Sequence, residues 1–239
     1  MSEMVRRFLR QKFGSLTSVL ALSLLALLAC LPLNAGQGFG SLETLAVVVL
    51  AAGSVSRDAA SGALQMILSR PIRRSDYLAG RYLGILTALA LFLVGSIAIA
   101  GALDFVISLL KVVGGPRAFS FGSAGLAAGQ SFLAGALLAC ALLFFSTFLR
   151  GWGDVLAVTL AVILFGSMES LGRALNMPLV STAGRIAREN LAPSVPWELV
   201  FRGQNVLGEA TGRYVLALVL FGTLAVVVFS RREFAYGQD

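Results

Sequence analysis

The side chains of this sequence best suited to chemistry lie between residues 57 and 81, in a polar stretch that separates two apolar runs. The stretch has one early carboxylate, Asp58, and five arginines. Arginine binds phosphates and carboxylates through paired hydrogen bonds. The stretch is too basic to cross a bilayer and too amphipathic to be a simple loop. We therefore expect it to form a surface that another molecule binds.

Residues for catalysis are scarce. Histidine is absent, which removes imidazole bases, His-ligated haem and His-containing zinc sites. Cys30 and Cys140 lie inside apolar runs, where we expect them to pack as small hydrophobes rather than to form a disulfide or a metal site. Neither Lys12 nor Lys111 follows a glycine, so this sequence has no Gly-x-x-x-x-Gly-Lys-Ser/Thr phosphate loop. We predict no catalytic residue, no metal site and no cofactor bound by this chain.

The composition indicates an integral membrane protein, because 57% of the 239 residues are hydrophobic and only 13% are charged. The net charge of +7 does not predict a nucleic-acid partner, since the basic residues flank apolar runs instead of clustering. The first run could be a secretory signal, but it is long for one and lacks a small-x-small cleavage site. A spanning helix needs about 20 apolar residues, and we place six candidate spans in a single transmembrane domain, 1–239. Their ranges are about 15–33, 40–56, 82–109, 121–149, 152–171 and 213–230.

The distribution of positive charge predicts the orientation. Twelve of the 19 Lys and Arg residues precede the first span, follow the sixth, or lie between spans two and three or four and five. The positive-inside rule places these regions, and with them both termini, on the cytoplasmic side. The predicted location is the bacterial plasma membrane.

The N-terminal residues 1–14 alternate arginine with apolar side chains. This pattern predicts an amphipathic elbow helix that lies on the membrane, and the alternative is a cytoplasmic extension of the first span. Four basic side chains and one aromatic ring would face the membrane surface, the cations at anionic head groups and the ring in the lipid. These residues are Arg6, Arg7, Arg10, Lys12 and Phe8.

The stretch 57–81 reads as two helices joined by a turn. The first starts at Asp58 and carries Leu64 on its apolar side. It ends before Pro71, because the residue that precedes a proline disfavours the helical conformation. Ser75 can cap a second helix, which starts at Asp76 and continues into the third span. We expect a short, rigid helix-turn-helix at the cytoplasmic surface.

Residues 172–212 form the one long connection between spans. Its apolar residues predict short helices in the outer interface, either as a structural lid or as a docking site for an outer partner or substrate. Small residues in the spans predict close approach of helices. These are Gly80 and Gly84 at the start of the third span and Gly122, Gly125 and Gly129 in the fourth.

The chain resembles the ABC-2-type transporter permeases, especially a six-span branch with nitrous oxide reductase accessory permeases and gliding-motility permeases. In that family an acidic residue, a glycine, a Leu-x-x-Pro-x-x-Arg-like turn and a Gly-Lys or Gly-Arg pair precede the third span. The family more usually has glutamate at the acidic position. The corresponding residues here are Asp58, Gly62, Leu64, Leu68-Ser69-Arg70-Pro71, Arg74 and Gly80-Arg81, and the ending Phe229-Ser230-Arg231-Arg232-Glu233-Phe234 is also similar.

The resemblance implies a permease subunit of an ATP-driven exporter. Two permease chains, identical or different, would work with separate ATP-binding cassette subunits that hold the ATP and magnesium. Residues 57–81 would be the coupling segment, seated in a groove of the ATPase. The alternative is that its arginines hold lipid head groups and set the topology. The residues expected at the ATPase contact are Asp58, Gly62, Leu64, Arg70, Pro71, Arg73 and Arg74.

The predicted fold is therefore an all-α membrane protein with six transmembrane helices, an N-terminal elbow helix and a cytoplasmic coupling helix between spans two and three. A second functional hypothesis is a non-transporting scaffold that anchors a cytoplasmic or outer assembly through 57–81 or 172–212. A third, an intramembrane enzyme, lacks histidine, a metal cluster and a paired carboxylate constellation.

Overall fold

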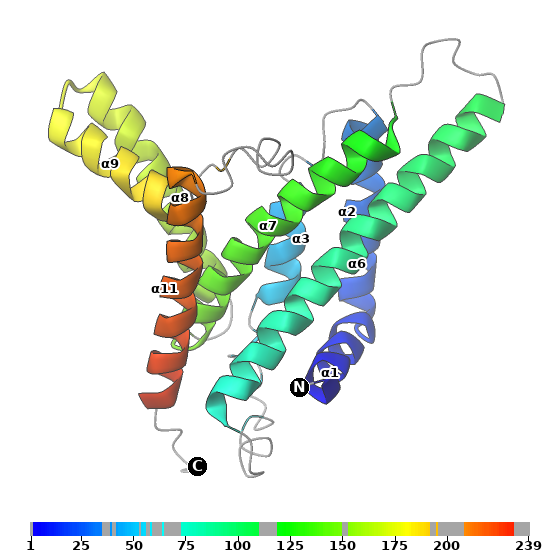
Figure 1. The fold of residues 1–239 in the computed structure, drawn as a ribbon, viewed down its shortest axis with the longest axis horizontal. Helices are drawn as coiled ribbons and strands as arrows, with labels where there is room; N and C mark the ends of the chain where they lie inside the picture. The colour runs from blue at the N-terminus through cyan, green and yellow to red at the C-terminus, as the bar shows by residue number, and fades with distance from the viewer. Residues whose placement is uncertain are drawn as a thin grey trace. The chain divides into compact units, whose positions relative to one another are not determined.

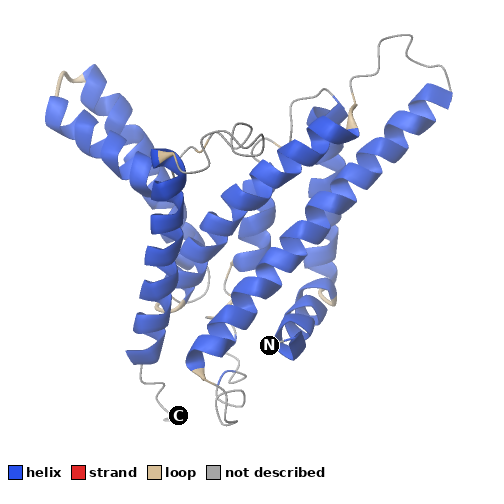
Figure 2. Ribbon diagram, viewed as in Figure 1, coloured by secondary structure: helices blue, strands red, loops and turns tan. Residues whose placement is uncertain are grey.

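The structure is a computed structural model that describes residues 2–34, 39, 42–52, 54–55, 58, 64, 73–109, 119–149, 153–191, 195 and 208–231. Within these ranges every regular element is an α-helix (Figure 2), which confirms the all-α prediction. The helices are α1 Ser2–Phe13, α2 Leu16–Asn34, α3 Leu42–Ala51, α6 Arg74–Leu109, α7 Phe121–Ser146, α8 Gly153–Ala174, α9 Pro178–Leu191 and α11 Glu209–Arg231 (Figure 1).

Four of the described helices are long and apolar enough to cross a membrane. These candidate spans are Leu16–Leu33, Arg74–Ser108, Phe121–Ser146 and Glu209–Arg231, and they correspond to the first, third, fourth and sixth predicted spans. The fifth predicted span corresponds to α8, a 22-residue helix that begins with an acidic first turn and ends with a basic one, and it is not among these four. The described chain thus has the length and composition of a multi-pass membrane protein.

The second predicted span, 40–56, is shorter than expected. Its helix, α3, has 10 residues, which at about 1.5 Å per residue is half of a membrane core. The chain turns at Ala52 and again at Ser54 and Val55. The Val55 N–H donates to the Ser146 hydroxyl at 3.1 Å instead of to a carbonyl one helical turn back. A tertiary hydrogen bond therefore competes with continuation of the helix, which the apolar sequence does not reveal.

The third predicted span belongs to a much longer helix. α6 has 36 residues and starts at Arg74, eight residues before the predicted start of the span. The amides of Asp76 and Tyr77 both donate to the Arg73 carbonyl, so the helix is initiated at Arg73 and not capped by Ser75 as predicted. The expected continuous run from the polar stretch into the span is present.

Contacts divide the chain into two compact units, residues 1–51 with 79–139 and residues 52–78 with 140–239. In the first unit α3, α6 and α7 pack through small and apolar side chains. Val47 of α3 and Leu89 of α6 are fully buried and both lie against Gly135 of α7. Tyr82 of α6 also donates from its hydroxyl to the Ala136 carbonyl of α7 at 3.2 Å.

The start of the chain forms a separate helix in this first unit. α1 ends at Phe13, and after the break at Gly14 and Ser15 the next helix begins at Leu16. The Gly14 amide donates to the Arg10 carbonyl at 2.8 Å as α1 ends, and the Val19 amide donates to the Ser15 carbonyl at 3.0 Å as α2 begins. A continuous extension of the first span, the alternative considered for residues 1–14, is therefore not what forms.

In the second unit α8 and α9 form a helical hairpin (Figure 1). Asn176 adopts a left-handed φ of 52° after α8, and the Met177 amide donates to the Gly172 carbonyl at 2.8 Å. This is a Schellman-type helix end, and Pro178 then occupies the first turn of α9, where its missing N–H costs nothing. A Cβ at Gly172 would lie 2.3 Å from the Ser181 nitrogen, so the two helices approach closely because this residue is glycine. Part of the predicted long connection is thus helical, as expected.

The end of α7 packs against α11 in the same unit. The Cys140 thiol lies 3.7 Å from the Leu218 carbonyl and 3.8 Å from a Cβ built on Gly222. Four phenylalanines extend this contact, with Phe144 lying 5.2 Å from Phe148 and 6.1 Å from Phe221 between ring centroids. The interface is almost wholly apolar.

Candidate functional site

A connected polar site lies where α6 begins. Tyr77 donates from its phenolic hydroxyl to the Asp58 carboxylate at 2.7 Å. Both residues are buried, each with only 2% of its side chain exposed. A buried carboxylate is costly unless donors satisfy it. The Tyr77 hydroxyl therefore ties the early part of the 57–81 stretch to the first turn of α6.

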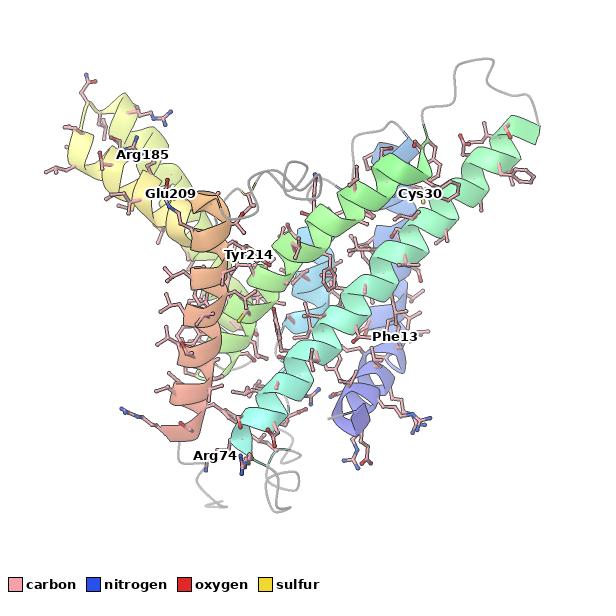
Figure 3. The ribbon with its side chains drawn as sticks, viewed as in Figure 1. Phe13, Cys30, Arg74, Arg185, Glu209 and Tyr214 are labelled. Carbon is pink, nitrogen blue, oxygen red and sulfur yellow. The ribbon has the colours of Figure 1, made fainter. Side chains whose placement is uncertain are left out.

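Arg74 connects the same turn to the end of α11. One nitrogen of its guanidinium donates to the Ser230 carbonyl at 2.9 Å and to the Phe229 carbonyl at 3.3 Å. The last carbonyls of a helix have no partner within the helix, and the helix dipole makes this end negative. A cation that donates to them is the preferred cap. Arg74 thus serves as a C-terminal cap for α11 from another helix, and it lies at the lower end of α6 in Figure 3.

Tyr77 makes the second contact with α11. Its ring stacks on that of Phe229, with centroids 5.7 Å apart and planes inclined by 17°. Phe229 is fully buried. Arg74 and Tyr77 are three positions apart and so share one face of α6, the face that contacts α11. We call the five residues Asp58, Arg74, Tyr77, Phe229 and Ser230 the α6–α11 junction.

The chain just before the 57–81 stretch is held as well. Val55 is buried and bonded to Ser146 at the end of α7, as described above. Leu64, on the predicted apolar side of the first helix, is 1% exposed. Asp58 and Leu64 are each in a helical conformation, but most of the predicted first helix lies outside the described residues, so that helix stays a prediction. Val55, two residues before the stretch, is therefore attached to α7, and Arg74 near the end of the stretch is attached to α11, with both contacts inside the second unit.

The residues predicted to contact an ATPase fall into three groups. Arg73 is exposed, whereas Asp58 and Leu64 are buried and Arg74 is partly covered by α11. Direct contact of each of these residues with a partner stays a prediction. The remaining three predicted residues, Gly62, Arg70 and Pro71, lie outside the described residues.

Some of the membrane-surface residues predicted on α1 are exposed and others are buried. Arg6, Arg7 and Arg10 are exposed, and Arg7 pairs with Glu3 one turn away at 3.4 Å. Phe8 was expected to enter lipid but is instead 1% exposed inside the protein. A Cβ at Gly84 of α6 would lie 2.7 Å from Phe8 Cδ1, so the ring occupies a notch that only glycine leaves open. The prediction that Gly84 allows close helix approach is confirmed.

Two cations surround the Phe8 ring. The Arg81 guanidinium lies 5.5 Å and the Lys12 ammonium 5.9 Å from its centroid, both within the range of cation–π attraction. Lys12 donates to the Val49 carbonyl near the end of α3 at 3.1 Å, and Arg81 donates to Gln11 at 3.1 Å. Lys12, expected at lipid head groups, is buried and caps a helix instead, because the α3 carbonyls need a donor.

Sequence reasoning missed Tyr77 and Phe229 as functional residues. The signal for Tyr77 was present, since an aromatic residue three positions after Arg74 shares its helix face. The pairing with α11 had no local signal, because Arg74 and Phe229 are 155 positions apart in the chain. Among the described residues, no three acidic or cysteine side chains gather as a metal site would require.

Comparisons with known proteins place the chain in a family. The helices and the anchored basic stretch define a multi-pass membrane protein with a polar attachment at the start of α6. Residues 42–180, more than half of the chain, match the family described as ABC-2 family transporter protein. The chain belongs to this family of ABC transporter membrane subunits, which typically pair with a separate ATP-binding subunit. No curated protein matches the chain.

Proposed function

We propose that this chain is the permease subunit of an ATP-driven ABC transporter and that it binds a separate ATP-binding subunit through residues 57–81. The observation that carries the proposal is the family match, which covers this whole stretch. ATP and magnesium would be held by the partner, since the phosphate-binding loop is missing from this sequence. Two permease chains would form the translocation unit.

Attachments just before the stretch and near its end support the proposed coupling. Val55 is bonded to Ser146 of α7, and Arg74 is bonded to the last carbonyls of α11. Contacts of this kind can pass a displacement of the residues that make them to the helices that hold them. Exposed Arg73 is the described residue best placed to meet an acidic groove on the partner.

The proposal also includes the orientation of the chain in the membrane and the direction of transport. The positive-inside distribution supports a cytoplasmic 57–81 stretch and cytoplasmic termini in a bacterial plasma membrane. Export, and membership of the six-span branch named above, rest on the resemblance of the coupling residues. Scarce polar side chains in the spans support an amphiphilic cargo. The family match favours this function over the scaffold hypothesis.

The test is a mild-detergent pull-down of the tagged chain from its native membrane, followed by mass spectrometry. Arg73→Glu should abolish recovery of an ATPase, because it places a carboxylate where the acidic groove expects a cation. The matched control is Arg231→Glu, which reverses another exposed arginine outside the stretch and should retain the ATPase. If the wild-type chain recovers a cytoskeletal or outer protein and no ATPase, the chain is a scaffold and the proposal fails.

A further inference from the structure

We propose that Arg74 is a positioning residue that attaches α11 to the coupling segment, so that α11 carries the segment's movement to the α8–α9 hairpin. This inference rests on the proposed function and adds the route by which the movement travels. It uses contacts of the second unit only. The route has three parts: the α6–α11 junction, the length of α11, and the contact of α11 with α9.

The junction is built to resist separation. Arg74 bonds two consecutive carbonyls of the last turn of α11, and one turn later Tyr77 stacks on the Phe229 ring. Tyr77 also holds Asp58, which belongs to the coupling segment itself. Hydrogen bonds with a charged donor are about twice as strong as neutral ones. When Asp58 or Arg74 shifts, the first turn of α6 and the last turn of α11 must therefore move with it, or the buried Tyr77 contacts and the more exposed Arg74 bonds must break together.

α11 can transmit such a movement along its length. It is a helix of 23 residues and one of the four candidate spans. An uninterrupted helix is stiff along its axis, because every residue is tied to the next turn by a hydrogen bond. At its far end Arg213 forms an ion pair with Glu209, one turn away, which supports the first turn. A displacement at Ser230 thus reaches Glu209 with little loss.

The far end of α11 lies against the α8–α9 hairpin. α9 contacts α11, and Figure 1 shows the C-terminal end of α9 beside the first turn of α11. The hairpin is itself rigid, because Gly172 brings α8 against the backbone of α9. Its tip exposes Met177 and Leu179, the latter 85% exposed. The tip is therefore a place where movement is visible to a probe and is not damped by packing.

The experiment attaches a spin label to Leu179→Cys in a Cys30→Ala, Cys140→Ala background, with the complete transporter in membranes. Adding ATP should change the label's spectrum. Arg74→Gln should reduce this response, measured per bound ATPase subunit, about tenfold, because it removes the charge-assisted cap. Arg74→Lys keeps the charge without the planar fork and should restore part of the response. Arg231→Gln removes a neighbouring exposed charge and should leave the response unchanged.

The possible outcomes separate this inference from the proposed function. If no ATPase binds the parent chain, the proposed function fails. If the parent responds to ATP and Arg74→Gln responds equally, the attachment role is overturned and the proposed function stands. If Arg74→Gln releases the ATPase, Arg74 is a partner contact and the positioning role is overturned. Should Arg74→Gln fail to fold, Phe229→Leu removes the ring stack alone and must also weaken the response, or the inference fails.

Discussion

Removing the Tyr77 hydroxyl should destabilise the protein more than a typical loss of one oxygen. In the wild-type chain this hydroxyl donates to the Asp58 carboxylate at 2.7 Å, and both side chains are 2% exposed. In Tyr77→Phe the carboxylate loses a donor that water cannot replace. The ring and its stack on Phe229 remain, so the substitution tests the hydrogen bond and not the packing.

The expected loss of unfolding free energy follows from the charge and burial of the Asp58 carboxylate. Hydrogen bonds to charged groups contribute about 1.5–3 kcal/mol, against about 0.5–1.5 kcal/mol for neutral ones. Tyr82→Phe on the same helix is the matched comparison, since the Tyr82 hydroxyl donates to a neutral carbonyl at 3.2 Å and is only partly buried. We expect Tyr77→Phe to lower the free energy of unfolding by about 2 kcal/mol and Tyr82→Phe to lower it by about 1 kcal/mol.

The assay is equilibrium unfolding in mixed micelles titrated with sodium dodecyl sulfate and followed by far-ultraviolet circular dichroism. A double-mutant cycle with Asp58→Ala isolates the pairwise free energy. In the Asp58→Ala background, Tyr77→Phe should cost less than about 0.5 kcal/mol, because the acceptor is already gone. Equal costs in the two backgrounds, or a cost for Tyr77→Phe no larger than that for Tyr82→Phe, would refute the reasoning about this buried pair.

Two further predictions concern places where helices touch through glycine. Gly84→Val should detach α1, because even a Cβ there would lie 2.7 Å from Phe8 Cδ1, and hydrogen exchange of the α1 amides should rise; Gly95→Ala on the same helix meets nothing within 4 Å and should leave that exchange unchanged. Gly172→Ala should open the α8–α9 hairpin and expose α9 to protease, whereas Gly212→Ala, which also meets nothing within 4 Å, should not; equal cleavage of both variants would contradict the close approach at α8.

Local sequence patterns predicted those helices whose formation depends on residues close together in the chain. The apolar runs predicted α2, α6, α7 and α11, because a spanning helix satisfies its own backbone and needs only length and apolar side chains. The separate α1 also followed from its alternation of arginine and apolar residues. The apolar residues of 172–212 predicted short helices within the long connection, and α9 is a helix in this region.

The predictions failed where a distant residue decided the outcome. Gly122 and Gly125, predicted at a helix contact, are both exposed within the described part of this chain; small residues permit close approach but do not choose a partner, so that contact stays a prediction. Phe8 was assigned to lipid because its helix is amphipathic, but an apolar face packs equally well on protein. The Phe8 ring packs on protein here because Gly84 has no side chain to exclude it.

The candidate site was visible in the sequence only in part. The basic stretch and Asp58 stand out by composition, and the family match covers them. The contacts that these residues make cannot be predicted from the sequence. The acceptors for Arg74 are backbone carbonyls of α11, and every residue has such a carbonyl whatever its type. Which carbonyls lack a partner depends on where a helix ends in space and on what lies beside it.

The sequence by itself therefore determined the class of protein, the apolar composition of its spans and the basic character of the 57–81 stretch. These properties arise from apolar length, charge and helical periodicity, which act over neighbouring residues. Only the tertiary structure decided that α3 ends at Ala51, that Lys12 and Arg74 cap helices other than their own, and that Tyr77 holds Asp58. Such contacts join residues far apart in the chain, and they form only after the helices have packed.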